Sequence, residues 1–162
     1  MFAVMTDELR APRTDVEWRA YHDIRRRVLF ERRGRGSTYD PKHPDESRPG
    51  HYPLILWRGS EAIAVIRVDI DGGVAIFRRV AVREDVQRLG HGRRLLTMAE
   101  QFAQSLGCLR IDAHVHADAI GFYERCGFHR AANEASDAAT ILMTKALAAM
   151  RSADAPHGTQ RS

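Results

Sequence analysis

The stretch Gln87–Gly92, Gln-Arg-Leu-Gly-His-Gly, places two glycines just where a helical pattern begins. Glycine costs roughly 1 kcal/mol relative to alanine inside a helix, so a pair at a helix start indicates that something approaches the backbone closely. A helix N-terminus carries unpaired amide N–H groups and about half a positive charge, which suits a phosphate. The stretch therefore predicts a phosphate-binding turn. The alternative is a tight turn that needs only a positive φ.

Two common phosphate-binding motifs do not fit this stretch. The dinucleotide fingerprint requires a third glycine where this chain has Leu95. The P-loop requires four residues between its glycines and then Lys and Ser or Thr, which the chain does not supply there.

A second candidate element covers residues 117–128, Ala-Asp-Ala-Ile-Gly-Phe-Tyr-Glu-Arg-Cys-Gly-Phe. Its Tyr123 carries a phenol that can donate a proton to a leaving group. The alternative is that Tyr123 packs as an aromatic residue beside Phe122.

Together the two elements resemble the GNAT superfamily of N-acetyltransferases. Gln87–Gly92 is similar to the Gln/Arg-x-x-Gly-x-Gly/Ala acyl-CoA signature of that family, and residues 117–128 are similar to its Ala-x-x-Phe-Tyr-x-x-x-Gly-Phe element. The specific resemblance runs from about Phe77 to Phe128. It implies transfer of an acyl group, in the first place acetyl, from acetyl-CoA to a primary amine, with Tyr123 as the catalytic residue. An acyl-CoA-binding sensor without turnover is the alternative.

The resemblance also implies which residues contact the cofactor. Amides from Leu89 to Arg94 hold the pyrophosphate, and arginine side chains meet phosphate charge. The backbone of the diverging strand end pairs with pantetheine as an added strand would. His116 stands where the family commonly has an asparagine that contacts coenzyme A. The expected set is Ala81, Val82, Gln87, Arg88, Leu89, Gly90, His91, Gly92, Arg93, Arg94 and His116.

The general base is left open by the sequence: His114, His116, Asp69 or a water relay could accept the proton of the amine. Asp112, His114 and His116 alternate along one predicted strand and therefore share a face. The His-x-His pair could suggest a metal, but no further ligand is identifiable, so no metal is predicted.

Hydrophobic periodicity predicts the elements that position these residues. Thr14–Glu17 forms a capping box, and Leu95, Ala99, Phe102 and Leu106 share one helical face. Helices are expected over 15–33, from about 91 to 106 and over 117–126, and strands over 54–57, 61–70, 74–82, 108–115 and 139–147. The resemblance implies an α+β GNAT fold: a mixed, largely antiparallel twisted sheet flanked by helices on both faces, in three layers.

The segment from Gly34 to Pro53 has no usable period, which is typical of a substrate lid or of a solvated connector. As a lid, it could recognise a cationic amine through Asp40, Asp45 and Glu46. Residues 1–150 are expected to form one domain, and the polar tail 151–162 is expected to be disordered.

Composition and charge indicate which classes of partner fit this chain. The 162 residues are 44% hydrophobic and carry a net charge of +4, which fits an anionic cofactor, nucleic acid or a membrane surface. The arginines are not interleaved with aromatic residues, which argues against nucleic acid. No run approaches transmembrane length and no leader pattern is present, so a cytoplasmic protein without a membrane partner is expected. The acceptor, a small molecule or a protein amine, is left open, as is a homodimer.

Overall fold

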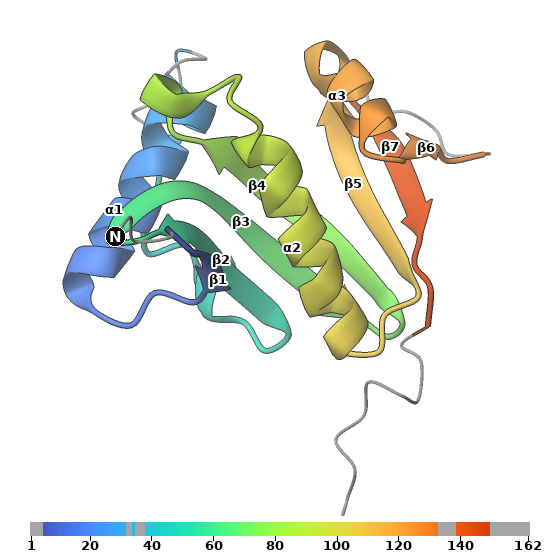
Figure 1. Ribbon diagram of the computed structural model, residues 1–162, viewed down its shortest axis with the longest axis horizontal. Helices are drawn as coiled ribbons and strands as arrows, with labels where there is room; N and C mark the ends of the chain where they lie inside the picture. The colour runs from blue at the N-terminus through green and yellow to red at the C-terminus, as the bar shows by residue number, and fades with distance from the viewer. Residues whose placement is uncertain (1–4, 32–33, 35–37, 133–138, 150–162) are drawn as a thin grey trace, which may run out of the picture.

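The computed structural model describes residues 5–31, 34, 38–132 and 139–149. Within this part of the chain, seven strands form one twisted sheet in the order β1-β2-β3-β4-β5-β7-β6 (Figure 1). All pairings are antiparallel except that of β4 with β5. The strands are β1 (Asp7–Arg10), β2 (His51–Arg58), β3 (Glu61–Asp71), β4 (Val74–Val82), β5 (Arg110–His116), β6 (His129–Arg130) and β7 (Thr140–Ala146). The predicted mixed, largely antiparallel sheet is confirmed.

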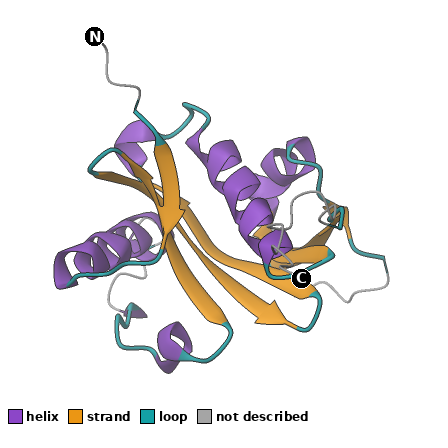
Figure 2. Cartoon of the chain, turned by 60° about the horizontal axis from the view of Figure 1, so that its bottom comes forward, coloured by secondary structure: helices purple, strands orange, loops and turns teal. Residues whose placement is uncertain are grey.

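Helices cover both faces of this sheet, as expected (Figure 2). On one face lies α1 (Asp15–Arg25), and the opposite face carries α2 (His91–Ser105) and α3 (Ile120–Arg125). The two faces follow from alternation along the strands. Ile55, Trp57 and Val65 pack with Tyr21 and Ile24 of α1. The intervening apolar side chains of β2 and β3 pack with Leu95, Leu96 and Ala99 of α2.

The first helix begins and continues much as its pattern predicts. The Thr14 hydroxyl accepts a hydrogen bond from the Glu17 amide at 3.2 Å, which caps the helix at its N-terminus. After Arg25 the chain continues as a π-helical segment, Arg26–Phe30. Residues 32 and 33, the end of the predicted helix, lie outside the described residues, as does the predicted tail 151–162.

Three short elements differ from the expectation. β1 and β6 are present although no strand was predicted there, and a 3-10 helix, Pro44–Ser47, interrupts the segment expected to lack structure. β2 begins at His51, three residues early. Pro53 can lie inside it because β1 pairs with β2 only from Ile55 to Arg58, so the missing N–H of Pro53 faces no strand on that side.

Candidate active site

β4 and β5 pair only along their first residues. Their parallel register runs from Val74 opposite Arg110 to Phe77 opposite Ala113. Beyond Phe77, β4 stays paired with β3 as far as Val82, while its other edge pairs with no described strand. The two strands separate at this end of the sheet (Figure 1). The bare edge of β4 can hydrogen-bond an extended ligand between the strands.

The N-terminus of α2 lies at the same end of the sheet. Gly90 precedes it in the left-handed region, with φ 87° and ψ 3°, and neither a capping side chain nor an acidic residue occupies the first turn. A Cβ on Gly90 would meet no protein atom within 4 Å, so the backbone itself requires this glycine only through its positive φ. The first-turn amides therefore present a partial positive charge, free of side-chain caps, to an anion.

Gly92 has a different reason to be glycine. A Cβ there would lie 3.1 Å from Cζ of Phe122 and 3.6 Å from Cγ2 of Val82. The absence of a side chain thus lets α3 pack against the first turn of α2 beside the end of β4. This contact brings together the two sequence elements on which the functional prediction rests.

The loop before α2 places its residues in different ways. The side-chain amide of Gln87 donates to the carbonyl of Val82 at 2.9 Å, which fastens the loop to the bare end of β4. Arg88, with φ 64°, and Leu89 are exposed. The side chain of His91 is buried, so only its backbone faces the helix N-terminus. The side chain of Gln87 thus positions the turn.

Arg93 and Arg94 lie beside different neighbours of α2. Nε of Arg94 lies 3.4 Å from a carboxylate oxygen of Asp7 in β1. Arg93 lines a cavity of about 290 Å³ between α2 and α3, together with Arg125 and Lys145. Both guanidinium groups are exposed at the start of the helix, but one of them is already paired with an acid.

Tyr123 has a buried ring and a hydroxyl without a partner. The ring meets Phe122 and Phe128 edge to face, at centroid distances of 5.4 and 5.3 Å. Burial raises the pKa of the phenol above its usual value. The hydroxyl hydrogen-bonds to no described residue, yet it is not one of the fully buried unpaired atoms, which are Arg25 Nε and Trp57 Nε1. It is therefore available to a ligand.

The candidates for the general base differ in their surroundings. Asp69 is buried, and both its carboxylate oxygens accept from the Arg67 guanidinium, at 2.8 and 3.0 Å. That bidentate pairing occupies both oxygens of the carboxylate with the Arg67 guanidinium. His114 and His116 are exposed on β5, on the face away from α2, with no partner among the described residues. They are the candidates that the structure leaves available.

The comparisons with known proteins agree with this geometry. Residues 18–128 match the profile of the Acetyltransferase (GNAT) family. The chain belongs to the GNAT family. A Lactobacillus plantarum structure assigned to the N-acetyltransferases is 26% identical, with a TM-score of 0.72, over 90% of this chain and 100% of that one. The comparison with curated proteins gave no match.

Two N-acetyltransferase structures of lower sequence identity show the same fold. The PaiA N-acetyltransferase from Thermoplasma acidophilum, solved with coenzyme A, is 19% identical, with a TM-score of 0.72, over 88% of this chain and 100% of that one. The Escherichia coli ribosomal-protein-S18-alanine N-acetyltransferase is 20% identical, with a TM-score of 0.68, over 93% of this chain and 99% of that one.

This GNAT protein also contains a charged network that the sequence did not predict. Glu46, from the 3-10 helix, accepts hydrogen bonds from Arg25 of α1, Arg67 of β3 and the Tyr21 hydroxyl. Burial raises the pKa of the Glu46 carboxyl, but the charge of Arg25 and its hydrogen bond outweigh burial and hold the pKa below its usual value. The alternation of Arg67 and Asp69 along β3 was the available signal. Glu46 is thus used within the protein, which argues against its recognising a cationic amine.

Two further observations concern the described residues alone. They contain no group of three or more His, Cys, Asp or Glu side chains placed to hold a metal ion. None of the helices observed among them has the length and apolar character needed to cross a membrane.

Proposed function

We propose that this GNAT protein is an acyl-CoA-dependent N-acyltransferase that transfers the acetyl group of acetyl-CoA to a primary amine by direct attack. The proposal rests on one observation, that three features lie at the same end of the sheet. They are the bare edge of β4, the uncapped N-terminus of α2 and the Tyr123 hydroxyl, which has no partner among the described residues. The known proteins with this fold include one solved with coenzyme A, which supports the choice of cofactor.

In this proposal the backbone does most of the binding. First-turn amides of α2 hold the pyrophosphate behind Gly90, and Arg88 and Arg93 supply charge because their guanidinium groups are exposed. The β4 edge at Ala81 and Val82 pairs with the pantetheine amides. Gln87 holds that edge against the loop through its bond to Val82. Because the backbone of β4 makes these contacts, the identity of its side chains matters little for pantetheine binding. This is consistent with the absence of a polar motif at Ala81 and Val82.

Acetyl-CoA supplies an activated thioester, whose C–S bond breaks as the amine nitrogen forms the new C–N bond. Tyr123 hydrogen-bonds the departing sulfur and gives it a proton. The phenol is protonated at neutral pH, as any tyrosine is, and burial raises its pKa further. The proton lost by the amine passes to His114, His116 or an ordered water, because Asp69 is held by Arg67.

Kinetics with Tyr123→Phe test the proposal. Free-thiol release from acetyl-CoA across a panel of amines should reveal an acceptor. We expect the variant to keep acetyl-CoA affinity and to lose kcat by up to about 10²–10⁴-fold. Tyr52→Phe is the matched control, because Tyr52 also packs its ring edge to face, on Phe102, but is exposed on β2.

The outcomes separate two classes of function. Equal single-turnover rates in the parent and Tyr123→Phe would remove the proton-donor role. Acetyl-CoA binding without thiol release for any amine would favour the sensor, the second candidate function. A cytoplasmic location and the possible homodimer stay predictions.

A further inference from the structure

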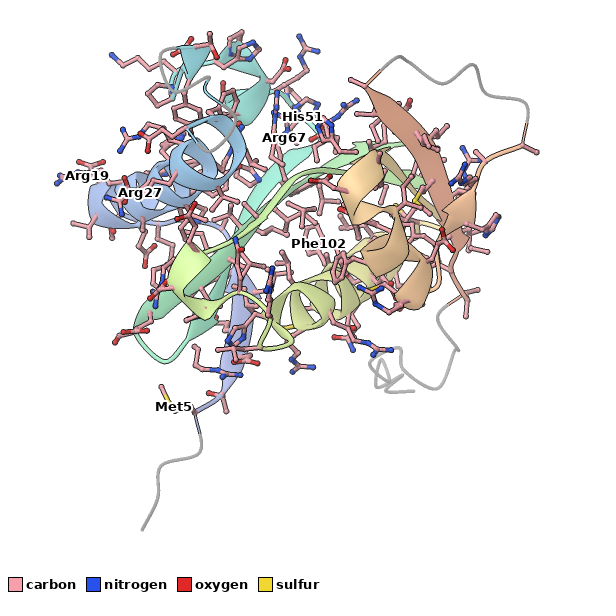
Figure 3. The ribbon with its side chains drawn as sticks, turned by 90° about the horizontal axis from the view of Figure 1, so that it is seen from above. Met5, Arg19, Arg27, His51, Arg67 and Phe102 are labelled. Atoms are coloured by element: carbon pink, nitrogen blue, oxygen red, sulfur yellow. The ribbon has the colours of Figure 1, made fainter. Side chains whose placement is uncertain are left out.

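The face of the sheet that carries α1 holds more positive than negative charge near the separation of β4 and β5. Two carboxylates pair with the arginines there: Asp69, which is buried, and Glu46, whose side chain is 9% exposed. Asp69 is paired with Arg67 at 2.8 Å and with Arg78 at 3.0 Å. Nε2 of His51 lies 3.5 Å from the same carboxylate. Figure 3 labels His51 next to Arg67. Glu46 is shared by Arg25 and, at 3.4 Å, by Arg67.

Arg79 is the arginine of this group that forms no ion pair with a carboxylate of the described residues. It forms no ion pair or hydrogen bond with any described residue, and its guanidinium carbon lies 5.6 Å from the centroid of the Phe30 ring. Burial lowers the pKa of Arg79, and the charges of Arg25 and Arg67 lower it further. The charge of Glu46 opposes this lowering only in part. The side chain of Arg79 is nevertheless exposed enough to meet a ligand. An anion there would relieve the repulsion by Arg25 and Arg67.

The backbone of Arg79 is held in an uncommon conformation. Its φ is 57°, in the left-handed region that non-glycine residues seldom adopt, where the β3–β4 register shifts. Such conformations cost about 1–3 kcal/mol and tend to persist where they aim a side chain at a functional site. The shift directs Arg79 to the same face as Ala81, which packs in the α1 cluster with Tyr21.

The position of Arg79 along β4 relates it to the proposed cofactor site. It lies two residues beyond Phe77, the last residue paired with β5, and two residues before Ala81. The pyrophosphate turn at Gly90 belongs to α2 on the opposite face of the sheet. Arg79 therefore stands beside the strand separation, on the face from which a second substrate can approach without displacing α2.

We propose that Arg79 binds a carboxylate of the acceptor, so that the acceptor is a small molecule carrying both a primary amine and a carboxylate. The inference rests on the proposed N-acyltransferase function and names its substrate class. A guanidinium fork matches a carboxylate in a bidentate arrangement, and the ring of Phe30 supports the fork from one side. A polyamine is disfavoured at this surface, because it would bring further positive charge to unpaired Arg79.

Matched acceptor pairs test the inference. Thiol release from acetyl-CoA is measured for each proteinogenic amino acid, for its amide, which keeps the amine but lacks the charge, and for spermidine. We expect the accepted amino acids to exceed their amides in kcat/KM by about tenfold to a hundredfold, the range of a charged hydrogen bond. Spermidine should be a poor acceptor.

Substitution of Arg79 assigns the effect to this residue. Arg79→Met should raise KM for the amino acid by a similar factor and leave KM for the amide and the calorimetric acetyl-CoA affinity unchanged, while Arg79→Lys should retain part of the selectivity. Arg19→Met is the control: Arg19 is exposed on α1, has no partner among the described residues and lies at the outer side of the molecule (Figure 3). It should change neither constant.

These experiments distinguish failure of the proposed function from failure of the inference about Arg79. If acetyl-CoA does not bind, the proposed function fails and the inference with it. If acetyl-CoA binds but amides or spermidine are used as well as amino acids, or another amine is acetylated while no amino acid is, the inference alone is overturned. If acetyl-CoA binds and no amine is acetylated, the proposed transferase function fails and the inference fails with it. An equal loss for amino acid and amide in folded Arg79→Met, checked by circular dichroism, would also overturn it.

Discussion

Glu46→Gln should destabilise this protein far more than an ordinary surface substitution, because Glu46 joins the 3-10 helix to both α1 and the sheet. Its side chain is 9% exposed and that of Arg25 is 5% exposed. Arg25 Nε already lacks a partner, so the guanidinium depends on Glu46 and on the Tyr21 hydroxyl at 3.0 Å. A neutral amide would leave Arg25 and Arg67 with Asp69 as the remaining carboxylate of the network.

The size of the effect follows from the burial. Removing one partner of a buried ion pair costs about 3–5 kcal/mol. For a domain of this length each kcal/mol lowers the melting temperature by roughly 2–4 °C, so we expect a fall of about 10 °C at pH 7. Urea unfolding gives the free energy directly. Asp45→Asn is the control, because Asp45 is 34% exposed and meets Arg48 at 3.5 Å; it should cost less than about 1 kcal/mol.

The pH dependence gives a second check on the same residue. The folded-state pKa of Glu46 is lowered, so its stabilisation is present above the unfolded value near 4.3 and is lost as the pH falls through the folded pKa. The difference between parent and Glu46→Gln should therefore be largest near neutral pH and shrink in acid. A variant within about 0.5 kcal/mol of the parent at pH 7 would refute the reasoning.

Two further predictions concern packing. Gly92→Ala places a Cβ 3.1 Å from Phe122 and should lower the free energy of unfolding by about 1–3 kcal/mol. The double variant that adds Phe122→Leu should recover part of this loss, and strictly additive losses would contradict the contact. Burial raises the pKa of both cysteine thiols, Cys108 and Cys126. Ellman's reagent should therefore modify the folded protein slowly at pH 7 and should modify both thiols rapidly in urea. Fast reaction of both thiols in the folded protein would contradict this prediction.

The sequence predicted those parts of the fold that have a repeating local signal. The three central strands carry long apolar runs, and α2 carries an apolar helical stripe that ends at Gly107. These patterns can therefore be recognised in the sequence alone. β1 has a single buried-facing apolar residue, Leu9, and is held by pairing with Arg58 and its neighbours, which no local pattern reveals. The start of β2 at His51 was missed because the place of Pro53 beyond the β1–β2 pairing is a property of the folded sheet.

The site was predictable where short-range geometry defines it and unpredictable where distant residues meet. Gly90 was identified as a helix-start glycine, and the structure gives it the required positive φ. Gly92 was assigned to ligand approach, whereas its Cβ would also meet Phe122 of a later helix. The pairing of Glu46 with Arg25 spans 21 residues and depends on how α1 packs on the sheet. Glu46, which the sequence offered as a residue that could recognise an amine, is therefore held within a network of the protein's own arginines.

Calorimetric titration of acetyl-CoA into Gly90→Ala and Gly107→Ala tests the central claim most directly. Both glycines have a positive φ, 87° and 83°, both flank α2, and a Cβ on either would meet no protein atom within 4 Å. The backbone strain of the two variants should therefore be alike, and only the N-terminal one lies where a phosphate would sit. We predict that the parent and Gly107→Ala bind acetyl-CoA with the same affinity and that Gly90→Ala binds about tenfold or more weakly. Equal affinities in all three folded proteins, or no binding by the parent, would contradict the placement of the acyl-CoA pyrophosphate at this helix.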